Sequence, residues 1–392
     1  MAHVLIGFAE ALPAPEVVFS LRAAGHTVSA FARAARQPLA RLPLQAMHVI
    51  PAPETNGQAA ADALAALTEG PGAPDLVLPL DDAGLWLCGQ AGLNPARVAG
   101  ASGAQATLAL DKIQQIAAAR SAGLAVPETH VLLGAQDLPK DLPLPAIIKP
   151  APATLAQDGK LCKGPTAYLM DATADVTTEA ARVTATGPAL MQPLVHGTGE
   201  GVFGFAQSDG SVTAWSGHRR LRMMNPHGSG ASACVSTQPD PATREAVSRF
   251  IAETGWRGPF MMEFLRGPDG TLWFMELNGR MWGSLALARR QGLEYPAWAV
   301  ALAIDPGFRP NPPPPPKAPI TLRNLGRDLL HLLFVLRGPK SAFHRERWPR
   351  FLTSLAGVLR PAPPRSFYNY DPAHRLFFLR DAAWTIGRTL RR

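Results

Sequence analysis

The sequence has few cysteines, no long apolar run and few lysines, and each shortage narrows what the protein can be. Its three cysteines lie far apart and form no CxxC pair, which supports neither a disulfide framework nor a zinc site and favours a reducing compartment. No stretch approaches the ~18 uninterrupted apolar residues of a membrane span. The first residues lack a basic start, and Glu10 interrupts the apolar run that a signal peptide would continue. We therefore expect a cytoplasmic protein.

Lysine makes up only 7 of the 38 basic residues, and the positive charge is unevenly spread. The formal net charge of +8 permits nucleic acid, anionic membranes or phosphorylated ligands as partners. Residues 317–392 carry 15 Lys plus Arg and 4 Asp plus Glu, so this segment is at about +11 and the body at about −3. Such a body offers no basic face interleaved with aromatic residues, and we expect no nucleic-acid partner.

The first 105 residues alternate strand and helix patterns, beginning with the apolar run HVLIGF. This order predicts an α/β domain with a parallel sheet. Its first turn lacks GxGxxG, so a dinucleotide site there has little support. Asp81 and Asp82 follow a predicted strand, where such sheets often bind ligands, although a helix N-cap is the favoured interpretation.

Mixed α and β patterns continue from 106 to 309, which predicts an α+β domain whose lid subdomain covers about 106–190. A single helix is predicted over 108–124, ended by Gly123. The segment PNPPPPPKAP at 310–319 is a polyproline linker.

Residues 320–392 are predicted to form a basic helical C-terminal extension. Its first helix would place four leucines on one face, Leu329, Leu332, Leu333 and Leu336. Basic amphipathic helices can lie on anionic membranes, but packing on the body or on a protein partner is the favoured interpretation.

A predicted hairpin at 258–280 carries the strongest chemical signal. The strands PFMMEFL and TLWFMEL flank the turn RGPDG, so Glu263 and Glu276 come within about one cross-strand position. Asn278 shares a face with Glu276 because strand side chains alternate. Two carboxylates among Met and Phe side chains would repel each other unless a divalent cation joined them, and Mg²⁺ fits this ligand set. Arg280 is placed to reach a phosphoryl group beside that metal, whereas a solvent-facing charged stripe is the less favoured alternative.

Weaker signals accompany the hairpin. Lys149 ends an apolar strand, where a side chain that reaches the rim is favoured over one paired with an anion. Lys112 begins a helix, where the macrodipole disfavours a cation unless an anion is present. Pro193 cannot donate to a sheet, so the strand is expected to leave the sheet there with free backbone groups nearby. In the segment 218–232, three arginines precede a Gly-Ser loop. This pattern is equally compatible with an anion-binding site and with a solvent-exposed basic strand.

In this order and spacing, the motifs DK at 111–112, IIKP at 147–150, MQPLVHGTGE at 191–200 and ME-x12-ELNGR at 262–280 resemble the ATP-grasp superfamily. The resemblance covers about 105–300 and is closest to its carboxylate-amine ligase-like branch. Residues 1–105 resemble the pre-ATP-grasp domain of biotin carboxylase and of the carbamoyl-phosphate synthase large chain. The resemblance implies a two-subdomain fold that clamps ATP. The loop after Lys149 departs from the pattern because it lacks a glycine-rich run, although Lys160 and Lys163 could replace it.

The resemblance also implies roles for individual residues. Lys112 and Lys149 would hold the ATP phosphates. The adenine would be contacted by the backbone of Gln192, Pro193 and Leu194, and the ribose by Glu200. One or two Mg²⁺ ions, with Mn²⁺ as an alternative, would be bound by Glu263, Glu276 and Asn278, and Arg280 would stabilise the transferred phosphoryl group. The substrate carboxylate would be received by Arg220, Arg222, Ser229 and Gly230.

The implied activity is ATP-dependent ligation. Such enzymes convert a carboxylate to an acyl phosphate, which an amine or thiol attacks with release of ADP and phosphate. We expect a small-molecule carboxylate, amino-acid-like among the candidates, and an amine. The alternative is a catalytically silent ATP-binding scaffold or regulatory protein that docks through its basic extension, at a membrane periphery or on a protein. A homodimer is a further hypothesis.

Overall fold

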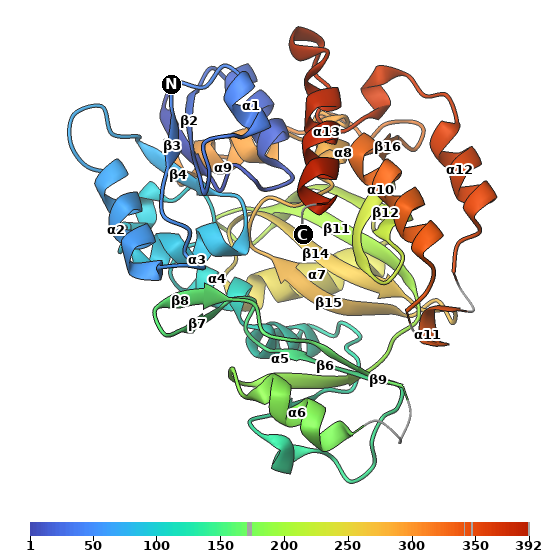
Figure 1. Cartoon of the computed structure of the whole chain (residues 1–392). Helices are drawn as coiled ribbons and strands as arrows, with labels where there is room; N and C mark the ends of the chain where they lie inside the picture. Colours follow the sequence, from blue (N-terminus) through green and yellow to red (C-terminus); the bar gives the residue numbers. More distant parts are fainter. Residues whose placement is uncertain (171–174, 341, 346–347, 391–392) are drawn as a thin grey trace.

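A computed structural model of the chain describes residues 1–170, 175–340, 342–345 and 348–390 (Figure 1). The side chains of Ser229, Ala342 and Phe343 lie outside the described part. The α/β and α+β architecture predicted from the sequence is confirmed. A parallel sheet at the N-terminal end is followed by a small antiparallel sheet, a large antiparallel sheet and a group of C-terminal helices (Figure 1).

The N-terminal sheet is parallel throughout, with strand order β3-β2-β1-β4. Its strands are β1 (His3–Gly7), β2 (Thr27–Ala32), β3 (Met47–Val49) and β4 (Leu76–Pro79). The helices of this region are α1 (Ala14–Ala23), α2 (Gly57–Leu67) and α3 (Asp82–Gln90). The N-cap interpretation of Asp81 is confirmed, because its side chain accepts a hydrogen bond from the Gly84 N–H at 2.7 Å.

The predicted lid subdomain is an antiparallel sheet of order β5-β10-β6-β9, which occupies the lower lobe of Figure 1. It consists of β5 (His130–Leu132), β6 (Ala146–Pro150), β9 (Ala167–Leu169), β10 (Ala189–Pro193) and the covering helix α6 (Val176–Thr184). Between β6 and β9, where the sequence lacks a glycine-rich run, the chain forms a two-stranded hairpin of β7 (Leu155–Gln157) and β8 (Lys160–Cys162).

The single helix predicted over 108–124 is wrong. The chain instead forms α4 (Ala104–Leu110) and α5 (Lys112–Ser121), which meet at Asp111. The Asp111 carboxylate accepts hydrogen bonds from the N–H groups of Ile113 and Gln114 and thereby caps the second helix. The apolar pattern continues through this break, which is why periodicity alone did not reveal it.

The large sheet has the order β15-β14-β11-β12-β13-β16 and is antiparallel. Its strands are β11 (Thr198–Ala206), β12 (Val212–Asn225), β13 (Ser229–Thr237), β14 (Gly258–Arg266), β15 (Leu272–Asn278) and β16 (Thr321–Arg323), accompanied by α7 (Pro241–Thr254), α8 (Leu285–Arg289) and α9 (Tyr295–Ile304). Phe203, Trp282 and Tyr295 are fully buried in a core that also contains Val4 and Ile6 of β1. This shared core fixes the large sheet against the N-terminal domain.

The C-terminal extension is helical, as predicted, but it is not separated from the body. It contains α10 (Leu325–Arg337), α11 (Ala342–Arg345), α12 (Phe351–Leu359) and α13 (Phe377–Leu390). Its strand β16 pairs with β13 and extends the large sheet. The Asn369 N–H donates to Glu16 of α1, and Arg290 donates to the Tyr370 carbonyl. Figure 1 accordingly shows α13 standing beside α1.

Helix α10 packs through Leu330, His331 and Val335, whereas Leu329 and Leu336 of the predicted leucine face stay exposed. The buried face of α10, which also includes Asp328, therefore differs from the predicted leucine face. None of the described helices is both long and apolar enough to span a bilayer.

Candidate active site

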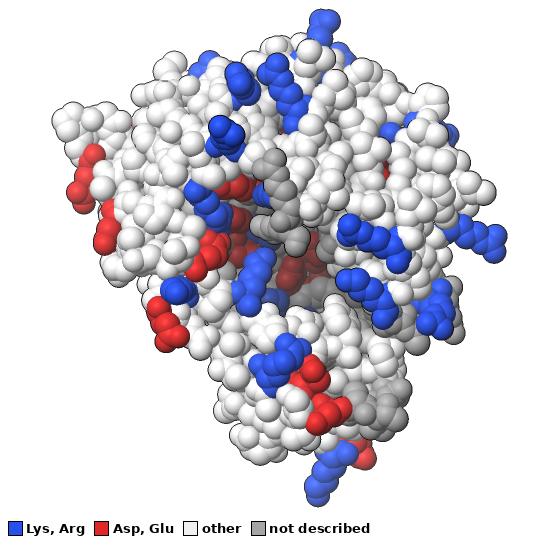
Figure 2. Space-filling view, viewed as in Figure 1, with Lys and Arg blue, Asp and Glu red and all other residues white. Residues whose placement is uncertain are grey.

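Two adjoining hollows meet at the hairpin of β14 and β15. Glu263 and Glu276 are direct partners in the strand register, which confirms their predicted proximity. Glu276 and Asn278 line both hollows. The inner hollow, of about 270 Å³, extends from them towards the N-terminal domain and the C-terminal extension. The lid hollow, of about 280 Å³, extends towards β6 and the segment that follows β8. Figure 2 shows acidic and basic side chains gathered in the recess between the upper body and the lower lobe.

The two glutamates and the asparagine fit a hard divalent cation. Burial, and then the charge of Glu263, raise the pKa of Glu276. Asn278 is buried and its Nδ2 donates to the Met261 sulfur at 3.6 Å, which leaves its carbonyl oxygen as the ligand atom. The described residues contain no group of three or more His, Cys, Asp or Glu that could hold a metal, so this site consists of two carboxylates and an amide. Mg²⁺ accepts such a set when water and phosphate complete its octahedron.

Arg280 lies beside these acids and is held by a residue from another domain. Its Nε donates to Asp82 Oδ1 at 3.1 Å, and Asp82 belongs to the first turn of α3. Burial opposes the charge on Arg280, but Asp82 and then Glu276 outweigh it, so the pKa of the guanidinium is raised. A fixed cation therefore stands next to the candidate metal site.

Three lysines line the lid hollow, Lys112, Lys149 and Lys163. Burial, and then the charge of Lys112, lower the pKa of Lys149 to about 8. The structure thus brings together the two lysines predicted for phosphate binding and Lys163, which lies in the segment without the glycine-rich run. Lys160 is exposed on β8 and does not line this hollow. Several cations around one acid-lined space match a polyphosphate that also carries a metal.

The β7–β8 hairpin is closed onto the N-terminal domain. The Gly57 N–H at the start of α2 donates to the Gly159 carbonyl at 2.7 Å, and the Leu161 N–H donates to the Pro53 carbonyl at 2.8 Å. Gly159 follows Asp158 in the tight turn, and both residues have positive φ angles, of 70° and 50°. The hairpin is therefore fixed to the N-terminal domain, and residues directly after it, Lys163 and Gly164, line the lid hollow.

The residues predicted to contact the nucleoside already have partners within the protein. Gln192 is buried and donates to the Thr129 hydroxyl at 2.9 Å. Pro193 pairs with Ala146 in the sheet, and the Leu194 N–H donates to the Pro145 carbonyl at 2.7 Å, so this amide is not free as the sequence suggested. Glu200 accepts two hydrogen bonds from Arg266, each of 2.9 Å. Adenine and ribose contacts by these residues stay predictions.

The residues predicted for the substrate carboxylate divide between two places. Arg220 lines the inner hollow, where its Nη2 donates to Glu263 Oε2 at 2.6 Å, and Gly230 lies on the same wall. Arg222 is not brought there, because its Nε donates to Asp328 of α10 at 2.9 Å. Register shifts on either side of Arg222 in the β12–β13 pair re-aim this side chain. The Ser229 side chain is outside the described part.

Other residues of the inner hollow were missed in the sequence, namely Arg327, Tyr368, His218 and Ser284. The His218 Nδ1 is 2.8 Å from the Ser284 hydroxyl, and its buried Nε2 has no hydrogen-bond partner among the described residues. Burial, and then Arg220, lower the pKa of His218 to about 3, so the ring is neutral. A usable signal existed only for Arg327, a cation in the first turn of a predicted helix, which the macrodipole disfavours.

No family model matches the sequence, and no curated protein matches it. Solved structures do. An L-amino acid ligase from Bacillus licheniformis is 18% identical, with a TM-score of 0.58 over 77% of this chain and 73% of that one. An N5-carboxyaminoimidazole synthetase from Staphylococcus aureus is 16% identical, with a TM-score of 0.61 over 84% and 83%.

The biotin carboxylase domain of 2-oxoglutarate carboxylase from Hydrogenobacter thermophilus is similar too. This domain was solved as a dimer with MgADP, ADP and bicarbonate, and it is 15% identical, with a TM-score of 0.61 over 80% of this chain and 72% of that one. These likenesses confirm the fold predicted from the motifs, which is the ATP-grasp fold.

Proposed function

We propose that the protein is an ATP-dependent ligase that activates a small carboxylate as an acyl phosphate for attack by an amine and releases ADP. One observation supports this most: Glu276 and Asn278 lie at the junction of a lysine-lined hollow and a second hollow, with Glu263 and Arg280 beside them. A phosphoryl donor on one side can therefore meet an acceptor on the other. Amino-acid-like substrates, and thiols in place of the amine, belong to the same proposal.

The lid hollow would hold the ATP phosphates. Lys112, Lys149 and Lys163 supply cationic donors there, and Glu263, Glu276 and Asn278 would hold Mg²⁺, or Mn²⁺ in its place. When bound, the ion neutralises phosphate charge and orients the transferred group. The MgADP found in the solved carboxylase domain supports this assignment of the nucleotide and metal.

The reaction would proceed across the hairpin. A carboxylate oxygen in the inner hollow forms a bond to the γ-phosphorus while the bond to the ADP oxygen breaks. The amine then forms a bond to the acyl carbon, and phosphate leaves with the former carboxylate oxygen. Arg280, fixed by Asp82, would meet the charge on the transferred group, and the docked β7–β8 hairpin would exclude water that would hydrolyse the acyl phosphate.

The alternative, a silent ATP-binding scaffold, gains no support from this site. A scaffold needs nucleotide contacts but not a cation held at the acceptor side, and Arg280 is held there by an ion pair to Asp82. A homodimer is proposed as well, and light scattering after size-exclusion chromatography tests it.

The deciding experiment is a screen of carboxylate and amine pairs for ADP release by the full chain with ATP and Mg²⁺, followed by mass spectrometry of the product. We expect ADP release to need both substrates and to stop when EDTA removes the metal. ADP binding that requires Mg²⁺, without turnover for any pair, would favour the scaffold. Absence of both binding and turnover would refute the proposed nucleotide site.

A further inference from the structure

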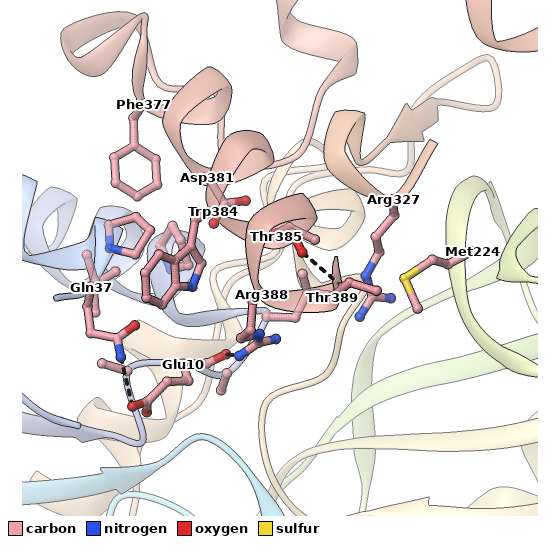
Figure 3. A pocket seen from close by; sticks show the side chains of 16 residues that line it. Glu10, Gln37, Met224, Arg327, Phe377, Asp381, Trp384, Thr385, Arg388 and Thr389 are labelled. Carbon is pink, nitrogen blue, oxygen red and sulfur yellow. Dashed lines mark hydrogen bonds between the residues drawn. The ribbon is translucent and has the colours of Figure 1, made fainter. Parts of the chain in front are cut away.

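Arg327 is a partly buried arginine on the wall between two cavities. It lines the inner hollow and also a neighbouring cavity of about 240 Å³, which we call the α13 pocket (Figure 3). Its Nη1 donates to the Ala231 carbonyl at 3.1 Å. The nearby Arg222 and Arg323 each form an ion pair with Asp328, whereas the described residues offer Arg327 no carboxylate within ion-pair distance.

Three features make this position unfavourable for a cation in the absence of a ligand. Burial lowers the pKa of Arg327, and no acid contacts its guanidinium among the described residues. Its backbone lies in the first turn of α10, where the helix dipole favours negative charge. Asp381 of α13 favours the charge of Arg327 from beyond ion-pair distance, and arginine does not give up its proton in proteins, so an anion on a bound molecule would complete the compensation.

Arg327 borders the inner hollow, of about 270 Å³, which has room for such an anion. Gly230 has a φ of 47° and faces the guanidinium so closely that a Cβ there would lie 2.6 Å from Nη1. Tyr368 lines the same part of the inner hollow. A larger residue at position 230 would push the guanidinium out of its place, so glycine here lets Arg327 keep its position on the wall of the hollow.

The placement of Arg327 separates it from the reacting end. The inner hollow contains Glu263, Glu276 and Arg280, and none of these lines the α13 pocket. The two cavities share Ala11, Leu12 and Arg327. An anion at Arg327 therefore lies at the end of the inner hollow that adjoins the α13 pocket, away from the hairpin acids.

The α13 pocket itself is amphipathic. Trp384 and Phe377 of α13 supply aromatic surface, and Figure 3 shows Trp384 facing the segment that carries Glu10. Two acids, Glu10 and Asp381, stand against the two arginines of the pocket, so a singly charged carboxylate fits better than a doubly charged phosphate.

We propose that Arg327 binds a second, non-reacting carboxylate of the substrate in the inner hollow, and that the α13 pocket holds the group attached to it. This inference rests on the proposed function. It makes Arg327 a positioning residue, since it would hold the substrate with its reacting end towards Glu276 and Arg280. It also gives the C-terminal extension a direct part in substrate selection.

The test uses the full chain and a panel of dicarboxylic acids, amino- and hydroxy-substituted ones included, each paired with the primary amide of one of its two carboxylates. Binding is measured by thermal shift and calorimetry with MgADP present. We expect at least one acid to bind the wild-type protein more tightly than its amide, and Arg327→Met to weaken that acid by about 10- to 100-fold, as loss of a charge-assisted hydrogen-bonded pair does. Arg327→Lys should keep part of the preference, and the amides should be unaffected.

Arg337→Met is the matched control, because Arg337 is exposed at the last turn of the same helix. Without ligand, Arg327→Met should not lower the unfolding temperature, whereas a purely structural arginine would lower it. An equal preference for acid and amide throughout the panel, or a preference that survives Arg327→Met, would overturn the proposal. Failure of MgADP to bind the wild-type protein would instead count against the proposed function.

Discussion

Glu276 is the side chain at which the lid hollow and the inner hollow meet, and it faces Glu263 across the hairpin. Replacing it with alanine removes one candidate metal ligand and charge from the centre of the site. We predict that Glu276→Ala lowers turnover by ~10² or more, as loss of one preorganised charge-stabilising group commonly does. ADP release under saturating substrates measures the effect. Glu253→Ala, an exposed acid on α7, is the control, and wild-type turnover in Glu276→Ala would refute the assignment.

Lys149 predicts a pH dependence of nucleotide binding. Burial and Lys112 lower its pKa from 10.5 to about 8, while Glu276 acts in the opposite direction. In the folded protein without nucleotide, the lysine therefore loses its proton above about pH 8, whereas bound phosphates would favour the charged form. Its folded pKa lies below the unfolded value, so it destabilises the fold below pH 8, and this cost is relieved as the pH rises towards 10.5.

We expect MgADP affinity to fall as the pH rises through 8, by up to about tenfold per unit. Lys149→Arg should bind MgADP with little pH dependence, because arginine stays charged. Calorimetric titrations at pH 7, 8 and 9 check this, with the exposed Lys140→Arg as control. Equal pH dependence in Lys149→Arg and the wild type would assign the effect to another group.

Residues of the site were predictable where the geometry is local. Glu263, Glu276 and Asn278 sit on one hairpin, so strand alternation and a short turn were enough to place them together. Alternation failed for Arg222, because the register shifts of β12 redirect it to Asp328. Arg327 lies 96 residues after its hydrogen-bond partner Ala231 in the sequence, and no local sequence pattern predicts such a distant contact.

Among the elements, the β7–β8 hairpin stands where the sequence lacks a glycine-rich run, and backbone hydrogen bonds attach it to the N-terminal domain. The start of α2 approaches it closely, since a Cβ at Gly57 would lie 2.9 Å from the Gly159 carbonyl oxygen and 3.0 Å from the Trp86 ring. A backbone contact of this kind cannot yield by a side-chain rotation. The sequence showed the missing glycines but not the surface on which the hairpin docks.

We predict that Gly57→Ala loosens the hairpin and raises the KM for ATP several-fold, with faster hydrogen exchange at the Leu161 amide. Gly89→Ala is the matched control, because Gly89 lies in helix α3 with open space around it and the change should stabilise the helix by roughly 0.5–1 kcal/mol. Unchanged exchange at Leu161 in Gly57→Ala would mean that the docking contact does not hold the hairpin closed.

At the scale of the whole molecule, the basic extension is packed into the body rather than separated from it. Its charge suggested a separate docking segment, but several arginines are used internally, and Arg323 alone donates to the carbonyls of Gly357, Val358 and Arg360. The strand β16 also covers the edge that β13 would otherwise expose. The composition showed correctly that the positive charge is concentrated in the extension. It could not show that arginine side chains there bond to carbonyls within the protein, because such contacts depend on the tertiary fold.

Asp328 tests whether body and extension unfold as one unit. It is fully buried and lies 2.8 Å from Arg222 Nη2 on β12 and 3.2 Å from Arg323 Nε on β16. Asp328→Ala leaves two partly buried guanidinium groups without this acid, and we predict a loss of about 3–5 kcal/mol in unfolding free energy. Glu245→Ala, which breaks the exposed pair with Arg249 on α7, should cost less than about 1 kcal/mol. Urea unfolding monitored by fluorescence and by circular dichroism should give coincident transitions for both variants, and an early separate transition in Asp328→Ala would show that the extension folds independently.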